Sequence, residues 1–284
     1  MRQVNPGFDP SHVLTFRLAP GLNGYAPERV FEIYSSILER LRSAPGVEAA
    51  SLSNYALISH GANIIVAART DEPVVDRASA ERSAFETTHL AWRMGVESRF
   101  FETMRIRIDR GRTFDDRDNR TNQPVVVINR ALAHQLFNTD DVVGRRFRVE
   151  SRAGNPTYEI VGVCADALFA SLRNANPPTI YVPYGQQGVG AMTLEVRTVG
   201  DPTAFVPTAR EIIRSVDANL PMLRVQTQDD QIAASISRER LFATLATWLG
   251  AVALTLSAIG LYALLAYTVT LRTGEIGIRM RCGL

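Results

Sequence analysis

The amino-acid sequence predicts an α+β protein in which a strand–helix–strand unit occurs twice, around an inserted α/β subdomain, and one transmembrane helix follows. Three observations lead to this prediction. Segments in which apolar and polar residues alternate, as in strands, flank an amphipathic helix near the start of the chain and again near residue 200. Residues 56–189 separate the two copies. Near the end, Leu241–Leu271 is a run of 31 residues without a charged side chain.

The first strand–helix–strand unit occupies about residues 12–55. His12–Ala19 alternates and contains β-forming residues, which predicts a strand. Pro27–Ala44 has apolar residues at spacings of three and four, a proline suited to the first helical turn, and Pro-Gly after it, which together predict a helix. Val47–Ser53 is expected to be the second strand.

The second unit occupies about residues 190–228. Met192–Thr198 alternates as a strand does, and Asp201 with Pro202 starts a helix that runs to about Val216. Pro207 is expected to break or restart this helix. Met222–Thr227 then forms a short strand. Because such units normally place their helices on one side of a sheet, two copies predict a small open-faced sandwich.

The inserted subdomain, about residues 56–189, is predicted to be α/β. The sequence indicates short helices at Arg99–Met104 and Arg130–Phe137. Prolines flank Ile180–Val182 and favour an edge or end strand there. Polar composition predicts loops at Thr70–Ser83 and Gly111–Asn122. Further strands are expected at Ile64–Ala68, Leu90–Glu97, Pro124–Asn129, Phe147–Glu150 and Tyr158–Cys164.

The uncharged run Leu241–Leu271 predicts a transmembrane helix. As a helix it extends about 46 Å, longer than the roughly 30 Å hydrocarbon core of a bilayer. The alternative is a buried core helix of a soluble protein. Trp248, Tyr262 and Tyr267 suit the two membrane interfaces. Asp229–Arg240 is expected to be a helix that joins the soluble part rigidly to the membrane helix.

One side of the predicted membrane helix carries small residues at spacings of three and four: Gly250, Ala253, Ser257 and Gly260. Small residues allow another transmembrane helix to approach closely, so this stripe is a candidate packing face. The other interpretation is the ordinary richness of membrane helices in Gly and Ala.

Composition excludes several chemistries. All 31 basic residues are Arg, so no Walker A phosphate site, lysine Schiff base or Ser-Lys dyad occurs in this sequence. A net charge of +2 argues against bulk nucleic-acid binding. Cys164 and Cys282 lie on opposite sides of the apolar run and predict neither a disulfide nor a zinc site.

No catalytic or metal-binding motif is found in the sequence. The histidines stand alone, at His12, His60, His89 and His134. Asp115, Asp116 and Asp118 resemble a calcium loop loosely, but the glycine and closing glutamate of an EF-hand are missing. We therefore expect no enzymatic activity, no metal and no cofactor.

Several stretches together resemble the MacB/FtsX-type ABC transporter permeases. Ala258–Tyr262 (AIGLY) followed by Arg272–Met280 (RTGEIGIRM) resembles the FtsX-like permease segment. Residues 1–240 look like a MacB-like periplasmic core domain, and the pieces that carry this likeness include NPGFDPSHVL, RLRSAPGVEAAS, FFETMRIRIDRGRTF, PVVVINRALAHQLF and IYVPYGQ. Their order resembles that of large permeases of the Acidobacterial duplicated type.

The resemblance implies a porter-like sandwich that is split in sequence, which agrees with the repeat described above. It also implies a place in the bacterial inner membrane, with residues 1–240 periplasmic, 241–271 spanning the bilayer and 272–284 starting a cytoplasmic coupling segment. The implied partners are an ABC ATPase on a separate chain, other permease helices or a second permease copy, and the lipid bilayer, but no nucleic acid. The implied function is to pass ATPase-driven motion to the periplasmic domain, in export or mechanotransmission.

Within the coupling segment, Glu275, Gly277 and Arg279 are the candidate contacts with the ATPase, because a charged pair on a short helix suits docking. The alternative is that they anchor the helix among the lipid headgroups. The ending Arg281-Cys282 departs from the family pattern of small and apolar residues. The family's preceding and following helices are also not present, so the resemblance implies a fragment.

A second function class stays open, a tail-anchored binding or sensor module with a cytoplasmic, non-catalytic domain. The start of the sequence has no apolar segment typical of a signal peptide, which leaves the export of the soluble part unexplained. Labelling of Cys164 by a membrane-impermeant thiol reagent is expected to distinguish the two topologies.

Overall fold

The computed structural model divides the chain into two units, residues 1–235 and 236–284. Within the helix α6 it describes side chains only for residues 228–235 and 246–264. The residues that the structure describes are 6–59, 63–71, 89–115, 117–118, 122–150, 154–168, 177–186 and 190–281.

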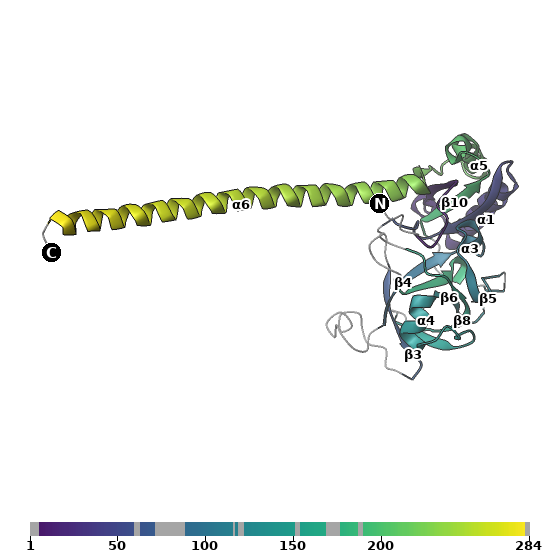
Figure 1. Ribbon diagram of the computed structural model, residues 1–284. Helices are drawn as coiled ribbons and strands as arrows, with labels where there is room; N and C mark the ends of the chain where they lie inside the picture. Colours follow the sequence, from purple (N-terminus) through teal and green to yellow (C-terminus); the bar gives the residue numbers. More distant parts are fainter. Residues whose placement is uncertain are drawn as a thin grey trace. The chain divides into compact units, whose positions relative to one another are not determined.

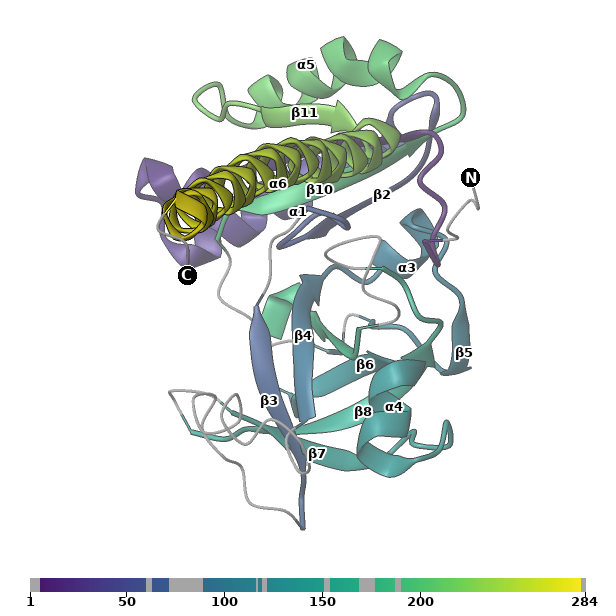
Figure 2. The ribbon, with the colours of Figure 1, turned by 60° about the vertical axis from the view of Figure 1, so that its left-hand side comes forward.

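The two strand–helix–strand copies interleave in one sheet (Figure 2). The first copy consists of β1 (Val13–Leu18), α1 (Pro27–Ser43) and β2 (Val47–Ser53). The second consists of β10 (Met192–Thr198), α5 (Val206–Val216) and β11 (Leu223–Thr227). The strand order is β11–β1–β10–β2, with antiparallel neighbours, so each copy inserts one strand between the two strands of the other. This is a ferredoxin-like arrangement, and it confirms the predicted split sandwich.

One face of this sheet packs against α1 and α5. Leu14, Phe16 and Leu18 alternate toward this side, and they share a buried cluster with residues of both helices. The hydroxyl of Tyr34 lies within this cluster. It is 2.9 Å from the carbonyl oxygen of Leu18 and accepts a hydrogen bond from the amide of Met192, so its burial leaves no polar atom unpaired. The 3-10 turn η3 (Pro202–Phe205) precedes α5, in agreement with the expected break near Pro207.

The opposite face of the same sheet is polar. Thr15, Ser51, Ser53, Glu195 and Arg197 alternate toward this side and are all buried. The short helix α3 (Phe100–Thr103) packs against β2 and β10, and the segment that follows β2 is bonded to the first turns of α6 (Gln228–Arg281). Burying this many polar groups requires that they bond to one another or to main-chain atoms.

The inserted part is a closed six-stranded sheet with one helix, α4 (Arg130–Phe137), packed on it (Figure 2). The ring order is β4–β3–β7–β8–β6–β9, and β9 pairs back with β4. A further strand, β5 (Ile108–Gly111), pairs with β8 outside the ring. The ring strands are β3 (Ile64–Arg69), β4 (His89–Val96), β6 (Val125–Asn129), β7 (Arg146–Val149), β8 (Thr157–Cys164) and β9 (Thr179–Pro183).

Two local expectations differ from the structure. The strand at Ile180–Val182 is not an edge strand, because β9 pairs with β6 on one side and with β4 on the other. The flanking prolines lie before the strand and at its last position, Pro183, so the amides between them remain free to pair. The strand β5 overlaps the start of the expected loop Gly111–Asn122, and part of Thr70–Ser83 lies outside the described residues.

The ferredoxin-like half and the ring are joined by three kinds of contact. Ser53 at the end of β2 pairs with Val96 at the end of β4, which makes the sheet continuous. Arg42 of α1 forms a 2.6 Å ion pair with Glu97. Phe31 of α1 stacks on a tyrosine of the 3-10 turn η2 (Tyr184–Gln186), with ring centres 5.1 Å apart. A further 3-10 turn, η1 (Pro20–Asn23), follows β1.

Candidate functional site

The histidines of the soluble unit do not form a metal site in the part of the chain that is described. No group of three or more His, Cys, Asp and Glu side chains is arranged there to hold an ion. His12 Nδ1 lies 3.0 Å from the carbonyl oxygen of Gly200, and His134 Nε2 lies 3.0 Å from a carboxylate oxygen of Asp140. His60 lies outside the described residues.

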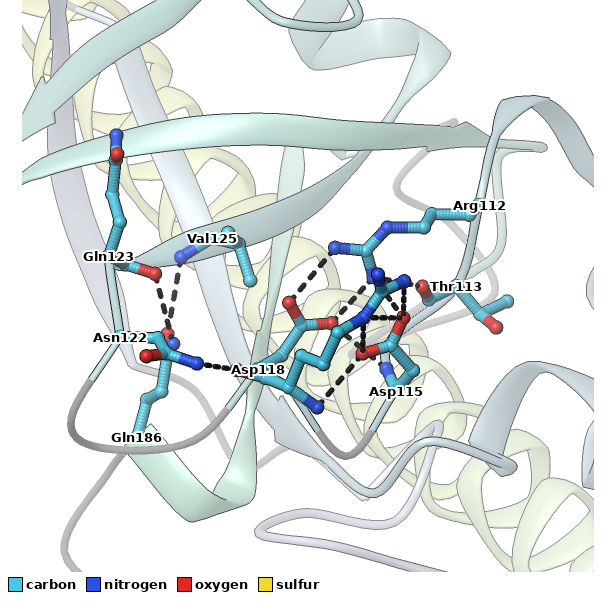
Figure 3. A network of polar contacts seen from close by, with 9 residues as sticks. Arg112, Thr113, Asp115, Asp118, Asn122, Gln123, Val125 and Gln186 are labelled. Carbon is cyan, nitrogen blue, oxygen red and sulfur yellow. Dashed lines mark hydrogen bonds and ion pairs between the residues drawn. The ribbon is translucent and has the colours of Figure 1, made fainter.

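The acidic loop after β5 is an ion-pair network (Figure 3). Two nitrogens of Arg112 donate to the carboxylate of Asp118 at 2.6 and 3.0 Å, and Arg117 donates to Asp115 at 2.7 Å. The hydrogen bonds from Arg117 lower the pKa of Asp115 to about 2. The carboxylates that resembled a calcium loop in sequence therefore have arginine partners; Asp116 lies outside the described residues.

The end of this loop is tied to η2, as Figure 3 also shows. The amide of Val125 donates to the side-chain oxygen of Gln186, whose nitrogen donates to the carbonyl oxygen of Gln123, both at 3.2 Å. Asn122 donates to the main chain of Arg117. These bonds give the loop a structural role at the start of β6.

Cys164 does not suit the labelling experiment expected from the sequence. Its side chain is fully buried at the end of β8, and this burial raises the pKa of the thiol well above its ordinary value. A thiol reagent reacts with an accessible thiolate. The folded protein therefore protects Cys164 on either side of a membrane, and the experiment needs a cysteine at an exposed position.

The long helix α6 starts with a reciprocal cap. The hydroxyl of Thr227 accepts a hydrogen bond from the amide of Asp230 at 3.0 Å, and the Asp230 carboxylate accepts one from the amide of Thr227 at 3.4 Å. Asp229 and Asp230 also place negative charge at the positive end of the helix dipole. The helix thus has a defined beginning immediately after β11.

Two amide side chains bind the first turns of α6 to the soluble fold. Gln228 and Gln231 both donate from Nε2 to the carbonyl oxygen of Leu57, at 2.9 and 2.8 Å. Ile232 packs against the buried cluster that contains Leu57 and Ile58. No linker separates β11 from the helix, and the predicted helix at Asp229–Arg240 is confirmed as a part of α6.

The stretch Ala246–Leu264 of α6 is long and apolar enough to cross a membrane. Its 19 residues have a mean hydropathy of 1.6, and none of them is buried within the chain. Trp248 is 69% exposed and Leu254 is 74% exposed. A core helix of a soluble protein buries most of its apolar side chains, so these features favour the membrane helix predicted for Leu241–Leu271 over the alternative.

The predicted packing stripe lies within this exposed stretch. Gly250, Ala253, Ser257 and Gly260 are all exposed. Apart from the backbone of α6 itself, a Cβ atom added to Gly250 or Gly260 would meet no atom of the described residues within 4 Å. The stripe therefore packs against nothing among the described residues, and its use as a contact surface remains a prediction.

The predicted coupling residues Glu275, Gly277 and Arg279 lie in the last turns of α6. Figure 1 shows α6 as one uninterrupted helix that continues to Arg281. The expected separate short helix is therefore an extension of the membrane helix. The structure describes the main chain in these turns but not the side chains.

A surface groove of about 410 Å³ lies at the C-terminal end of α5. Two arginines and several apolar side chains form its walls, and no residue that was predicted to be functional lines it. The lining residues are Arg210, Ile213, Arg214, Ala218, Asn219, Leu220, Pro221 and Met222.

The chain combines a ferredoxin-like domain, an inserted closed sheet and an exposed apolar helix that follows directly. These features define a class of membrane-anchored domain. Comparison with known families identifies the class. The sequence profile of the MacB-like periplasmic core domain matches residues 31–238, and the chain belongs to this family.

Curated relatives agree with this assignment. Over 237 residues the chain is 28% identical to the macrolide export ATP-binding/permease protein MacB of Burkholderia lata, an alignment that covers 77% of this chain and 33% of that protein. Over 199 residues it is 26% identical to the uncharacterized ABC transporter permease YknZ of Bacillus subtilis, covering 66% and 48% respectively. The chain therefore spans between a third and a half of the length of these two relatives.

A solved structure shows the same fold. The crystal structure of the periplasmic region of MacB from Actinobacillus actinomycetemcomitans matches with a TM-score of 0.51 and 12% sequence identity, covering 84% of this chain and 97% of that one. The predicted α+β class is confirmed by this match and by the arrangement of β1–α1–β2 with β10–α5–β11.

Proposed function

We propose that this chain is the periplasmic domain and an adjoining membrane helix of a MacB/FtsX-type export permease in the bacterial inner membrane. In this proposal the permease passes ATPase-driven motion across the bilayer to the periplasmic domain. Membership of the MacB-like family supports the permease assignment, and two relatives carry the words export and permease in their names.

The observation that carries the motion-transfer part of the proposal is the continuity of α6. One helix begins on the soluble fold at Gln228, runs through the apolar stretch and reaches Glu275 and Arg279. A helix transmits a displacement along its axis, whereas a flexible linker absorbs it. At about 1.5 Å per residue, its 54 residues extend about 81 Å, well beyond the thickness of a bilayer.

The proposal assigns ATP hydrolysis to another chain. This sequence has no lysine and so no Walker A site, and we propose no enzymatic activity or cofactor for it. The proposed partners are an ABC ATPase, other permease helices or a second permease copy along the small-residue stripe, and the lipid bilayer.

The coupling role is tested at Glu275 in a complete permease that contains this chain, reconstituted with its ATPase. Glu275→Ala is expected to reduce the stimulation of ATP hydrolysis at least about tenfold, as for the loss of one charge-assisted hydrogen bond. Thr273→Ala, in the same turn, serves as the matched control. Unchanged stimulation in Glu275→Ala would contradict coupling and favour a role in anchoring at the headgroups.

The location of the soluble unit is tested with a cysteine at Thr208, which is exposed on α5. In a Cys282→Ser background, Thr208→Cys is expected to react with a membrane-impermeant maleimide in intact spheroplasts. Labelling that appears only after lysis would overturn the periplasmic assignment. It would support the second candidate, a tail-anchored sensor module with a cytoplasmic domain.

A further inference from the structure

A buried carboxyl group lies at the centre of the polar face of the ferredoxin-like sheet. Glu195 is on the inner strand β10 and is 1% exposed. Its register neighbours are Thr15 on β1 and Ser51 on β2. Ser51 Oγ donates to Glu195 Oε2 at 3.2 Å, and Ser53 Oγ lies 2.5 Å from Glu195 Oε1.

The positions of the hydrogen atoms follow from counting donors. Ser53 Oγ lies 2.7 Å from the carbonyl oxygen of Tyr55 and 2.5 Å from Glu195 Oε1, but a hydroxyl has one proton to donate. The carbonyl of Tyr55 can only accept. Both contacts are therefore hydrogen bonds only when Ser53 donates to this carbonyl and the Glu195 carboxyl group donates to Ser53. A neutral Glu195 satisfies both contacts, and burial raises its pKa to about 8.

No cation neutralises Glu195 among the described residues around it. Glu97 is the nearby charge that raises its pKa further, and Glu97 is itself paired with Arg42. Arg17 on β1 donates to main-chain oxygens. Arg197, two residues along β10, also donates to main-chain oxygens. The segment that follows β2 contributes Tyr55, and the buried side chains of the first turns of α6 carry no charge.

The segment Tyr55–Ile58 connects this carboxyl group to α6. Leu57 and Ile58 are each 1% exposed, and Ile58 has a φ of 62°. A β-branched residue is strongly disfavoured in this left-handed region, so its partners must hold the segment in place. Those partners are Ser53 at Tyr55, and Gln228 with Gln231 at the Leu57 carbonyl.

We propose that the hydrogen bonds to the Leu57 carbonyl oxygen attach α6 to the soluble fold. This attachment point is called the joint below. Gln228 and Gln231 are its positioning residues, and the carboxyl proton of Glu195 keeps the joint in place through Ser53 and Tyr55. When a base in solvent removes that proton, the Ser53 hydroxyl turns to the carboxylate and releases the Tyr55 carbonyl. The joint has a role in export only if α6 transmits motion, so this part of the inference rests on the proposed function.

The proton dependence is tested by amide hydrogen exchange of the whole chain in detergent micelles, at pH 6 and pH 9, corrected for intrinsic exchange. At pH 9 a group with a pKa of about 8 is about 90% ionised. Protection of the amides of Leu57–Ser59 and Gln231–Ser235 is expected to be at least about fivefold lower at pH 9 than at pH 6. Amides of β8 should stay protected at both pH values, which distinguishes local release from unfolding.

Glu195→Gln keeps the hydrogen bonds of the neutral acid, because its amide nitrogen donates to Ser53 and its oxygen accepts from Ser51. This variant is expected to show equal protection at both pH values. Protection of the wild-type segment that does not change with pH, or that is lost equally in Glu195→Gln, would overturn the role of the proton.

The positioning role is tested with the double variant Gln228→Met and Gln231→Met, which keeps side-chain length but removes both donors. Protection of Leu57–Ser59 is expected to fall at both pH values, whereas Asp229→Asn, on the exposed side of the same turn, should leave it unchanged. If the double variant protected Leu57–Ser59 as well as the wild type does, the proposed positioning role of Gln228 and Gln231 would be overturned. This readout contains no ATPase, so its failure leaves the permease proposal standing, and a failure of Glu275→Ala leaves the joint standing.

Discussion

The Nε of Arg197 donates a hydrogen bond to the carbonyl oxygen of Thr103 at 2.7 Å, although the Arg197 side chain is only 1% exposed. Its two other nitrogens donate to the carbonyl oxygens of Ser11 and Asp9, at 2.7 and 2.6 Å. One guanidinium thus joins β10 to α3 and to the segment before β1. The planar fork of arginine supplies three donors in fixed directions, which a lysine does not.

We expect Arg197→Met to lower the free energy of unfolding by about 3 kcal/mol, because it leaves one buried and two part-buried carbonyl oxygens without their donor. Arg197→Lys should lower the free energy of unfolding by a smaller amount, since lysine retains the charge and some of the donors. The measurement is urea unfolding in detergent, followed by the fluorescence of Trp92 in a Trp248→Phe background. Arg210→Met, at an exposed position of α5, is the control and should change stability by less than about 0.5 kcal/mol. Equal losses in the two Met variants would contradict the role of Arg197.

The buried Glu195 predicts that stability depends on pH. Burial raises its pKa from the ordinary 4.5 to about 8, so the folded state favours the protonated form. The contribution of this group is therefore fully present below pH 4.5 and is lost as the pH rises to about 8, by at most about 1.4 kcal/mol for each pH unit. The difference in unfolding free energy between Glu195→Gln and the wild type should grow across this window. A difference that is constant with pH would contradict the assignment.

The small-residue stripe predicts an association surface on the membrane helix. Gly250→Ile and Gly260→Ile add bulk to the stripe and should weaken association with a second helix by about tenfold or more. Ala251→Ile adds similar bulk on the opposite side of the helix and should leave association unchanged. Energy transfer between labelled chains in bicelles measures the association. If all three variants behaved alike, the small residues would reflect membrane composition alone.

The elements that the sequence predicts most closely are those set by local patterns. Val47–Ser53 and Met192–Thr198 are strands over the predicted ranges, and both alternate between two packed faces. The helix Arg130–Phe137 is also as predicted, because the side chain of Asn129 caps it by accepting a hydrogen bond from the amide of Leu132. Alternation and helix capping can be recognised from residues that are close together in the sequence.

The features that local patterns could not predict depend on contacts distant in sequence. Closure of the ring requires Trp92 of β4 to pair with Thr179 of β9, and no signal in either strand specifies that partner. Glu195 looks like a solvent-facing residue of an alternating strand. Its hydrogen-bond partners, Ser51 and Ser53, lie on β2, far earlier in the chain. The amides of Gln228 and Gln231 are likewise unremarkable at the start of a helix until Leu57 is placed beside them.

In the function proposed above, motion driven by an ATPase reaches the soluble fold through α6. The most direct measurement is amide exchange at Leu57–Ser59 and Gln231–Ser235 in the complete permease with its ATPase, in nanodiscs, with and without ATP under conditions that block hydrolysis. We expect ATP binding to change exchange at both segments. Identical exchange in the two states, in a permease that still stimulates its ATPase, would contradict it.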